Sequence, residues 1–106
     1  MSHRFKKIAA WQMGMELARA VYTLTSSLPQ EEIYGLTAQL RRASVSVPSN
    51  IAEGAGRGSN ADFARFLHIA IGSLNEVETQ LLLADQIFGL PATSSGTLNL
   101  VDRCGG

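Results

Sequence analysis

The chain has 106 residues, of which 45% are hydrophobic and 17% are charged, and its nine basic residues balance nine acidic ones. This length predicts one domain over residues 1–106, and the low charged fraction excludes disorder driven by charge. A net charge of zero argues against a dedicated nucleic-acid clamp, because such modules carry a strong basic excess, although it leaves a local basic patch open.

Residues with distinctive chemistry are few. A single cysteine, Cys104, excludes an internal disulfide framework and is typical of a reducing cytoplasm. With only His3 and His68 beside it, no zinc pattern can be written. Gln12 and Glu16 break the apolar run that follows the basic N-terminus, so we expect neither a signal peptide nor a membrane span of about 20 apolar residues. We therefore expect a cytoplasmic protein.

The first predicted helix covers residues 5–28. Two neighbouring apolar stripes give it a face wide enough to pack against two other helices. The stripes are Ile8, Trp11, Met15, Ala18, Tyr22 and Leu17, Val21, Leu24, Leu28. Pro29 ends the helix.

The second predicted helix covers residues 32–56 and contains Pro48. An interior proline removes one hydrogen bond and costs roughly 3 kcal/mol, so the helix either stops and restarts there or bends. The apolar stripe keeps its phase from Val47 to Ile51, which favours a continuous helix with a kink. A glycine-rich breaker at residues 54–58 ends it.

The third predicted helix, residues 60–88, has the clearest pattern. Ser59 is its N-cap residue, and Asp62 completes a variant of the capping box. A heptad seam follows, through Phe63, Leu67, Ala70, Leu74, Val77, Leu81, Ala84 and Phe88. Gly89 and Pro91 end the helix.

A short fourth helix is predicted at residues 97–104, and no segment alternates with the period of a strand. The fold class is therefore all-α: an antiparallel up-and-down four-helix bundle with a kinked second helix and a short or truncated fourth helix. Because two helices have wider apolar faces than a three-helix core needs, part of this surface is expected to meet another chain.

No residue set predicts catalysis. The segment 56–61 matches the letters of a dinucleotide motif, but a helix precedes it where that motif needs a strand, so it is interpreted as a loop with a helix cap. A lone histidine, His68, beside an apolar seam is typical of a packing or interface residue. Glu76 and Glu78 lack the Glu-x-x-His pattern of a di-iron site. We predict no catalytic, cofactor-binding or metal-binding residue and no enzyme, and the residues identify no small-molecule substrate.

Basic residues suggest an alternative, RNA binding by a surface that an oligomer would multiply. The candidates are Arg4, Lys6, Lys7, Arg41, Arg42, Arg57 and Arg65. Ordinary surface and ion-pair roles remain the competing interpretation, because the acidic count is equal.

The stretch from Leu36 to Gly54, with Gly56-Arg57, Phe63, Arg65-Phe66-Leu67 and Gly72–Leu81, resembles a known family. This is the family of bacterial four-helix-bundle proteins encoded in intervening sequences of large-subunit ribosomal RNA genes. The resemblance covers roughly residues 5–90.

The resemblance implies an up-and-down four-helix bundle, homopentameric assembly and no established enzymatic activity. A related accessory protein of diversity-generating retroelements binds RNA and a reverse transcriptase through a basic surface. The balanced charge of this chain departs from those relatives. Its fourth helix also ends near residues 105–106, earlier than in the family, as if the chain were cut within it.

Six residues near the predicted seam of the second and third helices form a structural motif: Arg41, Pro48, Asn50, Glu53, Asn75 and Glu76. Because buried polar groups need partners, some of the polar ones are expected to hydrogen-bond across these two helices. The leading functional hypothesis is a non-enzymatic, self-associating interaction module or scaffold whose partner is itself, and whose possible further partner is RNA or an RNA-associated protein, with no membrane.

Overall fold

The computed structural model describes residues 4–90 and 96–105, and within these ranges it contains four α-helices and no strand. The prediction of an all-α chain is thus confirmed. The helices are α1 Ala9–Thr25, α2 Leu36–Ala55, α3 Asn60–Phe88 and α4 Thr97–Gly105, with 3-10 helices η1 Arg4–Lys7 and η2 Gln30–Glu32.

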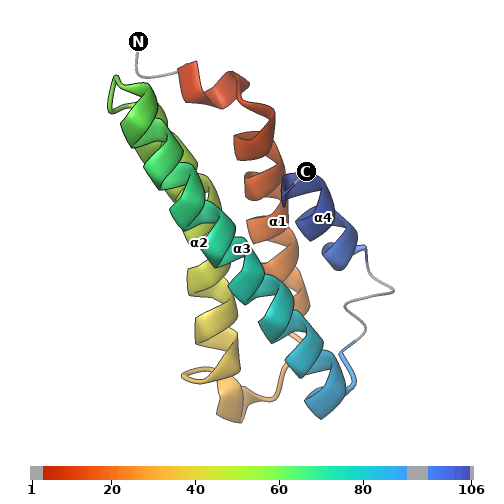
Figure 1. Cartoon of the computed structure of the whole chain (residues 1–106). Helices are drawn as coiled ribbons and strands as arrows, with labels where there is room; N and C mark the ends of the chain where they lie inside the picture. The colour runs from red at the N-terminus through yellow and green to blue at the C-terminus, as the bar shows by residue number, and fades with distance from the viewer. Residues whose placement is uncertain (1–3, 91–95, 106) are drawn as a thin grey trace.

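Three long helices lie lengthwise beside one another, and the short α4 packs against α1 (Figure 1). Helix α2 contacts both α1 and α3, and α4 also contacts both of them. The longest dimension is 43 Å. This is the length of α3, because its 29 residues rise about 1.5 Å each.

The register of α1 against α2 is fixed by two contacts. A Cβ on Gly14 would lie 3.3 Å from ring atoms of Pro48, so the glycine allows the two helices to approach closely. Towards the other end, Arg41 Nε donates a hydrogen bond of 2.9 Å to Thr25 Oγ1. Residue numbers therefore fall along α1 as they rise along α2.

The register of α2 against α3 is fixed in the same way. The hydroxyls of Ser46 and Ser73 are 2.7 Å apart. Gln80 Nε2 donates to Gln39 Oε1 at 3.5 Å. Residue numbers again decrease along α3 where they increase along α2, so the chain runs in the same direction in α1 and α3.

The core is built from the seams that the sequence pattern indicates. Leu17, Leu40 and Leu81 are fully buried, as are Val21 and Val77. The wider cluster adds Leu28, Ala43, Val47, Ile51, Ala70, Leu74, Ala84, Leu90 and Val101. The seam of α3 is less buried at its ends, where Phe88 is 37% exposed.

Helix boundaries differ from the predicted ones at the start of the chain and around the first connection. The chain from Arg4 to Lys7 forms η1, so α1 begins at Ala9 and not at residue 5. It ends at Thr25 because Leu28 precedes Pro29, where the helical conformation is disfavoured. Helix α2 begins at Leu36, whose N–H donates to Glu32 Oε1, because Gly35 has a non-helical backbone.

The continuity of α2 and both ends of α3 agree with the sequence pattern, and a kink at Pro48 stays a prediction. Helix α2 is continuous through Pro48. At α3, the Ser59 side chain accepts a hydrogen bond of 3.1 Å from the Asp62 N–H. The helix ends at Gly89, which has the left-handed conformation with φ 70° that glycine adopts at low cost.

Candidate functional site

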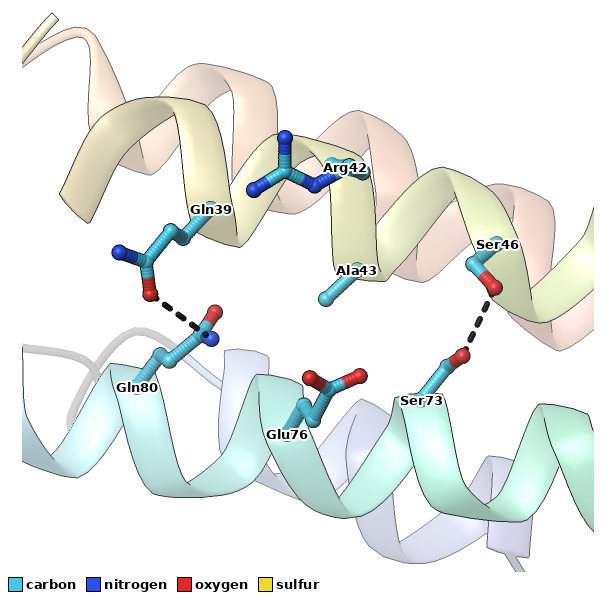
Figure 2. A pocket seen from close by; sticks show the side chains of 7 residues that line it. All are labelled: Gln39, Arg42, Ala43, Ser46, Ser73, Glu76 and Gln80. Carbon is cyan, nitrogen blue, oxygen red and sulfur yellow. Dashed lines mark hydrogen bonds between the residues drawn. The ribbon is translucent and has the colours of Figure 1, made fainter. Parts of the chain in front are cut away.

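A polar groove runs between α2 and α3 and has a volume of about 280 Å³ (Figure 2). Its charged and amide groups come from both helices. The lining residues are Gln39, Arg42, Ala43, Ser46, Ser73, Glu76 and Gln80. We call this surface the polar groove.

One end of the polar groove is closed by a chain of hydrogen bonds. Asn50 Nδ2 donates to the Ser46 carbonyl at 2.8 Å and to Ser46 Oγ at 2.9 Å. Because Ser46 Oγ accepts from the amide, its own hydroxyl can donate to Ser73 Oγ. These bonds join α2 to α3 and hold both serine side chains in place.

Three polar groups along the polar groove have no partner among the described residues. The Oε1 atom of Gln80 is buried and has no hydrogen-bond partner among the described residues. Arg42 and Glu76 are exposed, and neither forms an ion pair with another described residue, although both line this groove. An unpaired buried acceptor costs about 1–3 kcal/mol, so a donor placed here would be stabilising.

A second groove, of about 370 Å³, lies on the other side of α2, against α1. Its walls are mostly apolar, with one guanidinium at the edge. The lining residues are Trp11, Met15, Ala18, Arg19, Val45, Pro48, Ser49 and Ala52. We call this surface the apolar groove. The side chain of Arg19 is exposed and pairs with no described acidic group.

Arg41 connects α2 to α1. Besides its bond to Thr25, its Nη2 donates to the Tyr22 carbonyl at 3.4 Å, and its guanidinium carbon lies 4.5 Å from the centre of the Tyr22 ring. Such a cation–π contact contributes about 0.5–1 kcal/mol where it is exposed. The arginine therefore stabilises the α1–α2 contact.

The expected hydrogen bonds of the structural motif across α2 and α3 need correction. Arg41 is directed to α1, and Glu53 pairs with Arg57 on its own helix at 3.0 Å. Asn75 contributes its backbone carbonyl to Thr79. Among the described residues, the direct bonds between α2 and α3 come from serine and glutamine side chains instead. Asn50 takes part only through Ser46, because its amide reaches back one turn along its own helix.

Sequence reasoning had not assigned these serine and glutamine contacts to a site. Ser73 and Gln80 are one heptad apart and flank the apolar seam of α3. That spacing is the signal that could have found them. Identifying Gln39 as the partner of Gln80 also requires the register between the helices, which no single helix pattern contains.

The seven candidate RNA-binding residues do not share one surface. Arg41 faces α1 and Arg42 lines the polar groove. The side chain of Arg4 lies outside the described part of the structure. Of the remaining four, Lys6 and Lys7 belong to η1, Arg57 to the α2–α3 turn and Arg65 to the start of α3. η1 and the α2–α3 turn lie at the same end of the molecule (Figure 1).

At this end, Arg57 and Arg65 both stack on Phe66, with guanidinium carbons 5.0 and 4.4 Å from its ring centre. Both arginines also have acidic neighbours, since Arg65 lies 3.7 Å from Asp62 and Arg57 pairs with Glu53. These exposed pairs add little stability, but they neutralise part of the local positive charge.

Other candidate chemistry is sparse. No group of three His, Cys, Asp or Glu side chains that could hold a metal occurs in residues 4–90 and 96–105. His68 is exposed on α3. Burial raises the pKa of the half-buried Cys104 thiol, which makes it a weak nucleophile. No helix in the described ranges is long and apolar enough to cross a membrane.

A family model described as 23S rRNA-intervening sequence protein matches residues 6–100. No curated protein matches the chain. The family match confirms the resemblance inferred from the residues, and its description names no reaction.

Proposed function

Because the chain belongs to the family of 23S rRNA-intervening sequence proteins, we propose that it is a self-associating interaction module of the cytoplasm that catalyses no reaction. The proposal includes a single domain over residues 1–106, folded as an antiparallel up-and-down four-helix bundle. Its partner is a second copy of itself, and the resemblance to the family makes the homopentamer the expected assembly.

Exposed apolar surface is the observation that supports self-association. Five large side chains of α3 have exposed fractions between 38% and 63%, and the apolar groove lies uncovered on the other side of α2. The five are Ile69, Ile71, Leu82, Leu83 and Ile87. Three of these, Ile69, Leu83 and Ile87, project from one side of α3, and exposed apolar surface of this kind marks interaction sites. A net charge of zero also removes the repulsion that would oppose association.

The first prediction is a defined oligomer. Size-exclusion chromatography with light scattering at micromolar concentration is expected to give five times the chain mass of 11.4 kDa. Dilution should lower this mass, because non-covalent association depends on concentration. A strict monomer over the micromolar range would overturn the proposal.

RNA binding at the basic end is the second candidate function. It is supported by the four cations around η1 and the α2–α3 turn, against two acidic residues there, Glu53 and Asp62. In an oligomer this small excess would be repeated once per copy, which strengthens attraction for phosphates.

The second prediction tests this candidate by fluorescence anisotropy with a labelled single-stranded RNA. Affinity is expected to fall as salt rises, with a logarithmic slope of about 0.7 for each phosphate contact. The K6E/K7E variant should weaken binding and flatten the slope, whereas R103E, at an exposed arginine of α4, should change neither. Binding that K6E/K7E leaves unchanged would exclude this end as the RNA site.

A further inference from the structure

Two faces beside α2 have exposed apolar side chains and can contact another copy of the chain. On α3, Ile69 and Leu83 lie one heptad before and one heptad after Glu76, so all three project from the same side of the helix. Both apolar side chains are 42% exposed, and Glu76 belongs to the polar groove. We call this stripe the α3 ridge. The apolar groove between α1 and α2 is a concave surface that a ridge of this kind can fill.

The two faces are complementary in charge. The apolar groove has an exposed guanidinium at its edge, Arg19, without an acidic partner among the described residues. The α3 ridge has an exposed carboxylate, Glu76, without a basic partner there. The buried Gln80 Oε1, one turn further along α3, is an acceptor without a donor.

Contacts within the chain place these groups at the same level along the bundle. Gly14 lies against Pro48, which is two residues after Ser46 on α2, and Ser46 is bonded to Ser73 on α3. Because residue numbers decrease along α3 where they increase along α2, Pro48 and Gly14 are at the same height along the bundle as Ile71, two residues before Ser73.

Because α1 and α3 point in the same direction, Arg19, five residues after Gly14, is at the same height as Glu76, five residues after Ile71. Stepping the other way brings Ile69 level with the start of the apolar groove, between Trp11 and Met15. If neighbouring copies are related by a rotation about an axis parallel to the helices, heights along the bundle do not change. One such rotation would therefore bring Glu76 to Arg19 of the next copy and Ile69 to the start of its apolar groove.

We infer that the α3 ridge of one copy docks in the apolar groove of the next copy, with Glu76 of one copy paired to Arg19 of its neighbour. Ile69 enters the groove near Trp11, and burial of this apolar contact excludes water from the ion pair, which strengthens it. The inference rests on the proposed self-association and specifies its interface.

The position of the faces sets the kind of assembly. The contact joins two different surfaces, so it is heterologous, and it must close as a ring or extend as a filament. Both surfaces lie beside α2, on adjacent and not opposite sides of the bundle. Each copy is therefore turned relative to the last about an axis along the helices, which favours a closed ring with α2 on one side of it.

A charge-exchange experiment tests this interface by light scattering over a dilution series. R19E and E76R alone each place like charges in contact, and each is expected to raise the dissociation constant about tenfold or more. The double variant R19E/E76R restores opposite charges and should return the dissociation constant to about threefold of the original value or less. Neither residue has a charged partner among residues 4–90 and 96–105 of its own chain, so circular dichroism should show the helical fold retained in all three.

Matched controls are R103E on α4 and Q86R on α3, two exposed sites outside both grooves. They are expected to leave the dissociation constant unchanged. A wild-type monomer would overturn self-association itself. A wild-type oligomer that resists both single variants, or one that the double variant fails to restore, would overturn this interface while leaving self-association intact.

Discussion

Replacing Leu81 with alanine is expected to lower the free energy of unfolding by about 2–5 kcal/mol. The side chain is fully buried in the core of the bundle, so its truncation removes apolar contacts and leaves a cavity between helices that are held by contacts elsewhere. A chain of this size has only about 5–15 kcal/mol of total stability, so the loss is a large fraction of it. Urea denaturation followed by circular dichroism measures the change.

The matched control is the neighbouring residue, which is exposed to solvent. Leu82 is 38% exposed, so Leu82→Ala should lower the unfolding free energy by less than about 1 kcal/mol. Both variants are compared at one chain concentration, because stability of an assembly depends on concentration. Equal losses from the two substitutions would contradict the position of the core along α3.

Replacing Gly54 with alanine should lower the unfolding free energy by about 1–3 kcal/mol. A Cβ at this position would lie 2.7 Å from Phe66 Cβ, and a methyl group there forces α2 and α3 apart. The clash outweighs the gain of roughly 0.5–1 kcal/mol that alanine normally brings to a helix interior. Denaturation by urea again gives the difference.

Gly72 supplies the comparison, since nothing lies within 4 Å of a Cβ built there and it is also inside a helix. Gly72→Ala is expected to raise the unfolding free energy by roughly 0.5–1 kcal/mol. Opposite signs at the two glycines are the result that the close approach of α2 and α3 requires. A stabilising effect of Gly54→Ala would contradict that approach.

The sequence was most informative where one helix determines its own pattern. The heptad of α3 predicts that Val77 and Leu81 are buried, and Ser59 predicts the start of the helix, because both signals depend only on the spacing within one segment. Boundaries near the N-terminus were less predictable. The apolar pattern begins at Phe5, but the backbone adopts a 3-10 turn before α1 begins.

Contacts between helices were harder to predict. Arg41 is a neighbour of the α2–α3 seam in sequence terms, yet its side chain lies on the side of α2 that faces α1, where Tyr22 and Thr25 receive it. Which residues of α3 lie opposite Ser46 and Gln39 depends on the offset between the two helices along their axes. That distance is set by close approaches such as Gly54 to Phe66, which appear only in three dimensions.

The packing of α4 against α1 has a consequence for how the molecule folds. Helices α2 and α3 are joined by a short turn, so their contacts form with little loss of loop entropy. In contrast, Cys104 Sγ reaches the carbonyl of Ala10, almost a full chain length away in sequence. Contacts of such high sequence separation form late. We therefore expect the α2–α3 hairpin to form the folding nucleus, and α4 to join last and open first.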